Sequence, residues 1–215
     1  MYVFLGDSVL AKLHDDVFKA VLEKECYLNV TKNGISLCDL LKILVKDSFA
    51  LATNALLQSN TGTINFIIAI GTNNMMTNPS VLSLENLHKA LLPIMGKVRA
   101  IPCSSKLSFI GLASNPCKIH QQEVAVESIE STGGRKKRKR ESGSGSCHAC
   151  RRNEYNSSFN VLLRTLAAKC NFVYLESPAH DGEIWEWKDL THLDESEHLK
   201  FLQELMQRHI LRANT

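Results

Sequence analysis

The sequence predicts an α/β protein, a three-layer α/β/α sandwich built on a five-stranded parallel sheet. Five short apolar segments of β type alternate with segments of helical apolar spacing, a pattern typical of βαβ units with helices on both faces of a parallel sheet. The third apolar segment, INFIIAI, is almost continuously apolar and β-branched, as expected of a central strand covered on both faces. At 215 residues the chain is long enough to form one domain, over residues 1–215.

The first half of the chain contains clear start and stop signals. Gly6 ends the first apolar run, Lys32-Asn33-Gly34 forms a turn signal, and Ser36 is placed to cap a helix. The predicted elements are a strand at residues 2–5, a helix at 9–23, a strand at 26–30, a helix at 37–57 and a strand at 64–70.

The second half repeats this alternation around one unusual segment. Leu84, Leu87 and Leu91 share one side of a predicted helix, and helical spacing resumes at Phe159 after a stretch rich in Gly, Ser and basic residues. The predicted elements are a helix at residues 82–100, a strand at 107–112, an insertion at about 117–153, a helix from about 159, a strand at 172–175 and a helix at about 195–211.

Composition limits the class of protein. A hydrophobic content of 44% with 22% charged residues is ordinary for a globular protein, and no apolar run approaches the roughly 20 residues of a membrane-spanning helix. The start of the chain lacks a basic segment and a small-residue cleavage site, and most of the seven cysteines lie in or beside apolar segments, as reduced buried thiols do. We therefore expect an intracellular protein, cytoplasmic or nuclear.

Two short motifs carry the chemistry. Ser8 follows Gly6-Asp7 where the first strand turns into a helix, so its hydroxyl should lie at the rim of the sheet near the positive end of the helix. Near the other end, Asp189 and His192 are three residues apart in a loop, where a carboxylate can orient an imidazole that removes the proton of Ser8. Alternatively, Ser8 is only a helix cap and the Asp–His pair an ordinary surface or capping feature.

Four motifs in order resemble the blocks of the SGNH (GDSL-type) hydrolases, whose fold is flavodoxin-like. Gly6-Asp7-Ser8 follows the first strand, Gly34 the second, Gly71-Thr72-Asn73 the third, and Asp189-Leu190-Thr191-His192 precedes the last helix. The resemblance covers the chain from end to end apart from the insertion. Asn74 departs from the family pattern, which often has Asp at this position, and the neutral amide removes a charge from that turn.

The resemblance implies a serine esterase or acylhydrolase that needs no cofactor for catalysis. In that family pattern Ser8 is the nucleophile, His192 the general base and then acid, and Asp189 the residue that orients His192. The oxyanion hole is implied to consist of the Ser8 and Gly34 backbone N–H groups and the Asn73 side-chain amide. The substrate would be a carboxylic ester, often with a short acyl or acetyl group. Trp185 and Trp187, just ahead of the Asp–His loop, either wall an acyl pocket or pack a long loop onto the domain.

The insertion concentrates the positive charge of the chain. It holds nine basic and four acidic residues, whereas the whole chain has a net charge of +3. Six consecutive cations lie within it: Arg135, Lys136, Lys137, Arg138, Lys139 and Arg140. Such a run must be solvated. The alternatives are a nuclear-import signal, electrostatic binding of RNA, DNA or anionic lipid, or a solvated loop with no partner.

Cysteine and histidine pairs flank this basic run. Cys117 and His120 give C-x₂-H, and Cys147 and Cys150 give C-x₂-C, spacings that let two ligands of each pair reach one tetrahedral Zn²⁺. A structural zinc would close the insertion into a loop. Unrelated reduced thiols, or a Cys147–Cys150 redox pair, are the alternative.

Two functions therefore follow from the sequence. The first is ester hydrolysis through Ser8, His192 and Asp189, which the presence of all three residues favours. The second is nucleic-acid binding on the same scaffold, with hydrolysis secondary or lost. With this second function, the chain resembles the RNA-associated SGNH-like domain of Oskar and the esterase domains of retrotransposon-encoded RNA-binding proteins. Fold alone does not choose between them.

Overall fold

The computed structural model describes residues 1–22, 25–58, 62–71, 82–102, 104–113, 148–180, 185–188 and 192–213. Over these residues the chain forms a five-stranded parallel sheet with strand order β2-β1-β3-β4-β5. The strands are β1 (Tyr2–Gly6), β2 (Tyr27–Thr31), β3 (Ile64–Ala69), β4 (Ser104–Ile110) and β5 (Val173–Leu175). The predicted fold class is confirmed, and each predicted strand is present with ends shifted by at most three residues.

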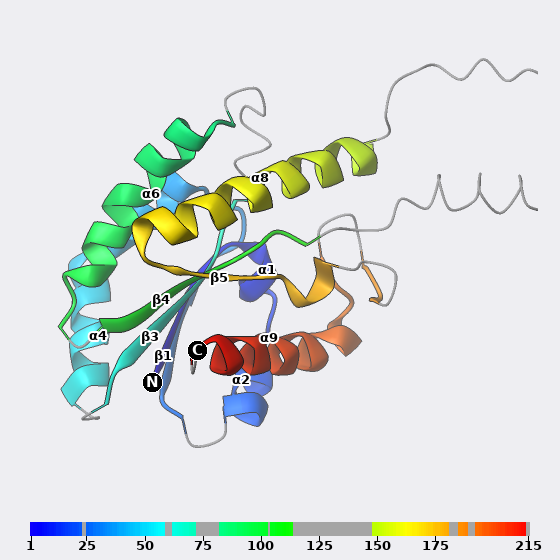
Figure 1. Ribbon diagram of the computed structural model, residues 1–215. Helices are drawn as coiled ribbons and strands as arrows, with labels where there is room; N and C mark the ends of the chain where they lie inside the picture. Colours follow the sequence, from blue (N-terminus) through cyan, green and yellow to red (C-terminus); the bar gives the residue numbers. More distant parts are fainter. Residues whose placement is uncertain are drawn as a thin grey trace, which may run out of the picture.

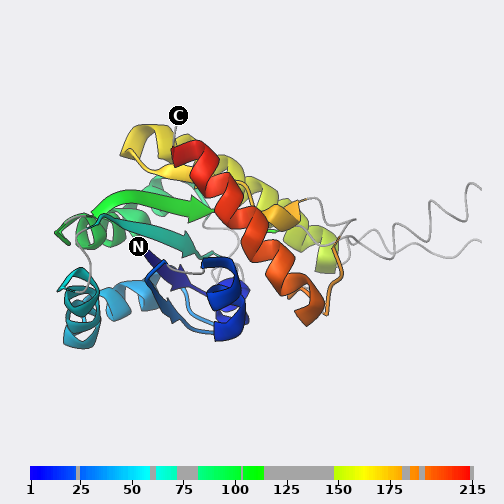
Figure 2. The same cartoon turned by 90° about the horizontal axis from the view of Figure 1, so that it is seen from below.

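Helices cover both faces of this sheet. Figure 1 shows α6 and α8 on one side of the strands and α2 and α9 on the other, and in Figure 2 α9 crosses in front of the sheet. The helices are α1 (Ser8–Ala11), α2 (Asp15–Leu22), α3 (Leu37–Leu44), α4 (Asp47–Gln58), α6 (Leu84–Arg99), α8 (His148–Cys170) and α9 (His198–Ala213), with 3₁₀ turns η2 (Pro178–His180) and η4 (Glu195–Glu197). Within the described ranges, no helix has both the length and the apolar character needed to cross a bilayer.

The strands divide the core into two apolar clusters. Because successive strand residues point to opposite faces, Val3 and Leu5 of β1 pack with α3, α4, α6 and α8, whereas Phe4 between them packs with α1, α2 and α9. On the neighbouring strand β3, Phe66 and Ile67 follow the same alternation. Burial of each such side chain is worth about 1.5–3 kcal/mol, so the central strands are held from both sides.

The strands end in register at one edge of the sheet. Gly6 of β1 lies beside Thr31 of β2 and Ala69 of β3. The segments that follow these three strands therefore leave the sheet at the same edge, where sites of open parallel sheets are found. Ser8 and Gly34 belong to two of these segments, and Gly71 belongs to the third.

Two predicted helices are each broken in two. Residues 9–23 form α1 and α2, and residues 37–57 form α3 and α4. In both cases an acidic residue marks the new start: Asp15 opens α2 and Asp47 opens α4. A carboxylate is favourable in the first turn of a helix, so it stabilises a second start within one apolar pattern. The predicted cap is confirmed: Ser36 forms a capping box with Asp39 at the start of α3.

Helix α8 begins much earlier than the sequence indicated. Apolar spacing resumes at Phe159, but the helix starts at His148, inside the segment assigned to the insertion. Its early turns bury polar side chains, among them Arg152 and Asn156, at positions that apolar periodicity cannot detect. The last part of the predicted insertion is therefore helical.

A polar pair lies in the core beneath α9. Ser108 of β4 and His209 of α9 are both almost fully buried, and the Ser108 hydroxyl oxygen lies 3.3 Å from His209 Nδ1. The His209 ring also packs edge-on against Tyr2. Burial, aided by the nearby positive charge of Lys106, lowers the pKa of His209 below its ordinary value. The folded protein therefore keeps this imidazole neutral at pH values where the unfolded chain protonates it.

This pair predicts acid sensitivity of the fold. The unfolded state binds more protons than the folded state as the pH falls through about 6.5, so the free energy of unfolding should fall there, by about 1.4 kcal/mol for each unit by which the pKa is lowered. Chemical denaturation of His209→Gln at pH 7.5 and pH 5 should show a smaller loss than wild type. His88→Gln on α6 is the control and should keep the wild-type loss. An unchanged loss in His209→Gln would show that other groups cause the acid sensitivity.

Candidate active site

Ser8 is held at the end of the central strand β1. The Asp7 backbone N–H donates to the carbonyl of Ala69 on β3 at 2.9 Å, and the Asp7 side chain caps α1 by accepting from the Val9 N–H at 3.3 Å. Ser8 is thus the first residue of α1 and not its cap, which removes the capping alternative. Its side chain is 6% exposed and borders a pocket.

Gly34 reaches the same edge from the second strand. The loop is tied to β1 because the Lys32 N–H donates to the Gly6 carbonyl at 2.9 Å. Gly34 has φ +76°, and an added Cβ would meet no atom within 4 Å. Glycine is therefore needed for the backbone conformation and not for space. Gly34 is not among the residues that line the pocket beside Ser8.

His192 is positioned by backbone hydrogen bonds from the other end of the chain. The Lys188 N–H donates to the His192 carbonyl at 2.9 Å, and the Asp194 N–H donates to the Glu186 carbonyl at 2.9 Å. An isolated antiparallel bridge between Trp187 and Leu193 lies between these bonds. The loop is therefore closed at its base, directly before α9.

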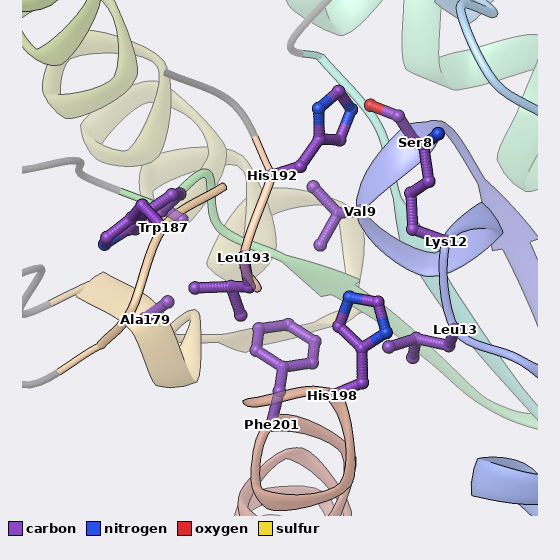
Figure 3. A pocket seen from close by; sticks show the side chains of 11 residues that line it. Ser8, Val9, Lys12, Leu13, Ala179, Trp187, His192, Leu193, His198 and Phe201 are labelled. Carbon is purple, nitrogen blue, oxygen red and sulfur yellow. The ribbon is translucent and has the colours of Figure 1, made fainter. Parts of the chain in front are cut away.

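Ser8 and His192 meet in one pocket. Figure 3 shows the Ser8 hydroxyl oxygen pointing toward the imidazole ring of His192. The pocket has a cavity volume of about 20 Å³. Its lining residues come from α1 and the two residues after it, from the segments after β4 and β5 including η2, and from the start of α9: Ser8, Val9, Lys12, Leu13, Ala113, Ala179, Trp187, His192, Leu193, His198 and Phe201. A hydroxyl and an imidazole thus face each other within a largely apolar wall.

The two tryptophans have different positions. Trp187 lines the pocket, as the acyl-pocket alternative expects. Trp185 is buried away from the pocket lining, edge-on to Phe201 and under the ammonium group of Lys200, which lies 4.2 Å from the ring centroid. The packing alternative therefore describes Trp185, and the acyl-pocket alternative stays a prediction for Trp187.

His198 is a pocket residue that sequence reasoning missed. It is 5% exposed, its ring centroid lies 6.4 Å from that of His14, and burial, together with the electrostatic influence of His14, lowers its pKa. The helical spacing of the last helix indicates that His198 is buried, because His198 is in phase with the buried Phe201 and Leu205. A neutral imidazole therefore forms part of the pocket wall beside His192 (Figure 3).

Helix α8 fixes the wall of the pocket that follows β4. The Asn160 amide donates to the Leu112 carbonyl at 2.9 Å, and its oxygen accepts from the Leu112 N–H at 2.6 Å. One turn earlier, the Asn156 amide donates to the carbonyl of Ala113 at 2.6 Å, and Ala113 lines the pocket. The Tyr155 hydroxyl reaches the Gly71 carbonyl at 3.4 Å. These buried polar side chains hold the ends of β3 and β4 as a backbone partner would.

Several predicted site residues lie outside the described residues. These are Asp189 and Asn73 of the catalytic set, Cys117, His120 and Cys147 of the zinc set, and Arg135, Lys136, Lys137, Arg138, Lys139 and Arg140 of the basic run. Of the zinc set the structure describes Cys150, half-buried in the first turn of α8. No cluster of three or more metal ligands occurs among the described residues. The zinc and nucleic-acid predictions therefore stay predictions.

Solved structures of the same fold cover nearly the whole chain. A GDSL-like lipase from Bacteroides thetaiotaomicron matches with a TM-score of 0.59 and 14% identity, over 99% of this chain and 88% of that chain. The lipase/acylhydrolase from Enterococcus faecalis has a TM-score of 0.51 and 15% identity, over 97% and 94% of the two chains. The extracellular lipase from Streptomyces rimosus has a TM-score of 0.54 and 15% identity, over 96% and 97%.

These similarities show that the chain has the SGNH, or GDSL-type, lipase/acylhydrolase fold. No protein-family model matches the sequence, and no curated protein matches it significantly. At sequence identities this low, the structural match establishes the fold alone. The chemistry has to be argued from the pocket.

The hydrogen bonds of Asn160 predict a large stability cost. Asn160→Leu keeps the side-chain volume but leaves the N–H and C=O of Leu112 buried without this partner, so we expect a loss of about 2–4 kcal/mol in the free energy of unfolding. Urea denaturation measures it. Val161→Ala is the control, because this neighbouring side chain is 58% exposed and should change stability by less than about 0.5 kcal/mol. A loss equal to that of the control would contradict the proposed role of α8.

Proposed function

We propose that the chain is a serine ester hydrolase in which Ser8 is the nucleophile and His192 the general base. One observation supports this most strongly: Ser8 and His192, from opposite ends of the chain, line the same pocket at the carboxyl edge of the sheet. Two further points agree with it, the order of the four motifs and the names of the solved structures of the same fold, which include lipases and acylhydrolases.

The proposed reaction has two steps. In the first, Ser8 Oγ attacks the ester carbonyl carbon while His192 accepts the hydroxyl proton, and the alcohol then leaves with that proton as the carbon–oxygen bond breaks. In the second, water loses a proton to His192 and attacks the acyl-enzyme, which releases the acid and restores the Ser8 hydroxyl. Asp189 is proposed to orient His192 and to stabilise its charged form.

The developing oxyanion needs hydrogen-bond donors. We assign this role to the backbone N–H groups of Ser8 and Gly34 and to the amide of Asn73. At the start of α1 the Ser8 N–H has no carbonyl of the preceding helical turn to bind, so it is available to an anion. Loss of one such donor typically costs about 10²–10³ in rate.

The size and character of the pocket favour a short acyl group. The cavity of about 20 Å³ is only slightly larger than the roughly 10–15 Å³ that one water molecule needs. Its apolar side is closed by Leu193, Trp187 and Phe201. An acetyl group adds one methyl to the carbonyl, which fits this space. Longer chains would have to displace these side chains.

The assigned nucleophile predicts a specific chemical reactivity. A fluorophosphonate probe should label wild-type protein and not Ser8→Ala, and 4-nitrophenyl acetate hydrolysis should fall to background in Ser8→Ala and by at least about 10³ in His192→Gln. Ser48→Ala, at an exposed position on α4, is the control and should react like wild type. Labelling or turnover that survives in Ser8→Ala would exclude Ser8 as the nucleophile.

Acyl-chain selectivity tests the size of the pocket. We expect kcat/KM for 4-nitrophenyl acetate to exceed that for 4-nitrophenyl octanoate by at least about tenfold. The extra methylenes of the octanoyl chain must displace side chains that line the pocket. Leu193→Ala should narrow this difference, whereas Leu199→Ala, at an exposed position on α9, should leave it unchanged. Wild-type protein that prefers the octanoate would contradict a short-acyl substrate.

A further inference from the structure

Lys12 lines the pocket one helical turn after Ser8. Lys12 is the C-cap of α1, and its backbone N–H donates to the Ser8 carbonyl at 3.2 Å, so the two residues lie one turn apart on the same side. Figure 3 shows the Lys12 side chain rising beside Ser8, on the opposite side from His192. A flexible cation therefore stands next to the hydroxyl that we propose as the nucleophile.

Lys12 has no protein counter-charge within the described residues. Five other lysines form ion pairs with nearby carboxylates: Lys19, Lys42, Lys89, Lys188 and Lys200. Lys12 forms none among the described residues. Asp15, the nearest acid along the chain, pairs with Lys19, and Asp7 is fully buried and accepts from the Val9 N–H at the start of α1.

The other pocket residues do not balance this charge. None of them is an aspartate or a glutamate, and the remaining titratable side chains are the imidazoles of His192 and His198. Among the described lining residues, the fixed charge is therefore that of Lys12, at the edge of the pocket. Lys12 would attract a negative group on a bound molecule, and no carboxylate among the described lining residues would repel it.

We propose that Lys12 makes this pocket selective for esters that carry an anionic group, a carboxylate or a phosphate, close to the ester bond. The proposal rests on the proposed function and specifies its substrate class. The apolar side of the pocket takes the short acyl group, and Lys12 binds the anion on the alcohol part of the ester. At the edge of a pocket in water, one such charge pair corresponds to roughly a tenfold preference.

The test compares acetate esters that differ in charge. The probes are 4-acetoxybenzoate, 4-acetoxyphenyl phosphate and the neutral methyl 4-acetoxybenzoate, and the measurement is the ratio of kcat/KM for each anionic ester to that for the neutral one. Comparing this ratio between variants cancels the intrinsic reactivity of the esters. The two anionic probes show which anion is preferred.

Lys12→Met, which keeps an apolar stem, should lower this ratio about tenfold, and Lys12→Arg should retain it. Raising NaCl from about 20 mM to about 500 mM should reduce the wild-type ratio toward that of Lys12→Met, because salt screens the attraction. Lys19→Met, outside the pocket, is the control and should keep the wild-type ratio. A ratio within twofold of wild type in Lys12→Met would overturn the proposal.

A binding measurement separates this proposal from the proposed function. Titration calorimetry with Ser8→Ala should show tighter binding of 4-hydroxybenzoate than of its methyl ester, and loss of that difference in the Ser8→Ala, Lys12→Met double variant. If wild-type protein hydrolyses none of the three esters, the proposed function fails while this measurement still decides the role of Lys12. Equal binding of the acid and its methyl ester would overturn the selectivity of Lys12.

Discussion

The close approach of β1 and β3 at Gly6 is the constraint on which the site depends. Gly6 has φ +149°, and a Cβ at this position would lie 2.0 Å from the Ala69 carbonyl oxygen. Only glycine lets the strand end this close to its neighbour, and the next residue then donates its N–H to that same carbonyl. Ser8 is directed to the edge of the sheet by this contact. A side chain at position 6 would separate the strands and displace the hydroxyl.

The parallel sheet then brings distant segments to the same edge. β1 lies between β2 and β3, and their ends are in register, so the segments that follow Gly6, Thr31 and Ala69 leave the sheet side by side although they are far apart along the chain. α9 packs on one face, and the loop before it places His192 beside Ser8. The opposite face is covered by α8, which holds the ends of β3 and β4 through Tyr155, Asn156 and Asn160. The pocket is thus supported from both layers.

The sequence was informative where apolar periodicity and short-range signals determine structure. It predicted the five strands, the capping of α3 by Ser36, the position of Ser8 at the carboxyl edge of the sheet and, through the resemblance of the motifs, the meeting of Ser8 and His192. It failed where polar groups do the packing. The early turns of α8 bury Asn156 and Asn160 against backbone that is distant in sequence, and no local sequence pattern indicates these hydrogen-bond partners. His198 was missed for a related reason, since a histidine in an apolar phase resembles an exposed residue until its neighbours are known.

The loop that carries His192 depends on its backbone more than on its side chains. Its base is closed by main-chain hydrogen bonds from Lys188 and Asp194 and by the bridge between Trp187 and Leu193. The Lys188 side chain, in contrast, reaches Glu195 only at the exposed surface, at 3.5 Å. Residue identity at position 188 is therefore largely interchangeable, while a proline there would remove the bond that orients the imidazole. Substitutions at position 188 can therefore change the exposed surface without moving the base of the loop.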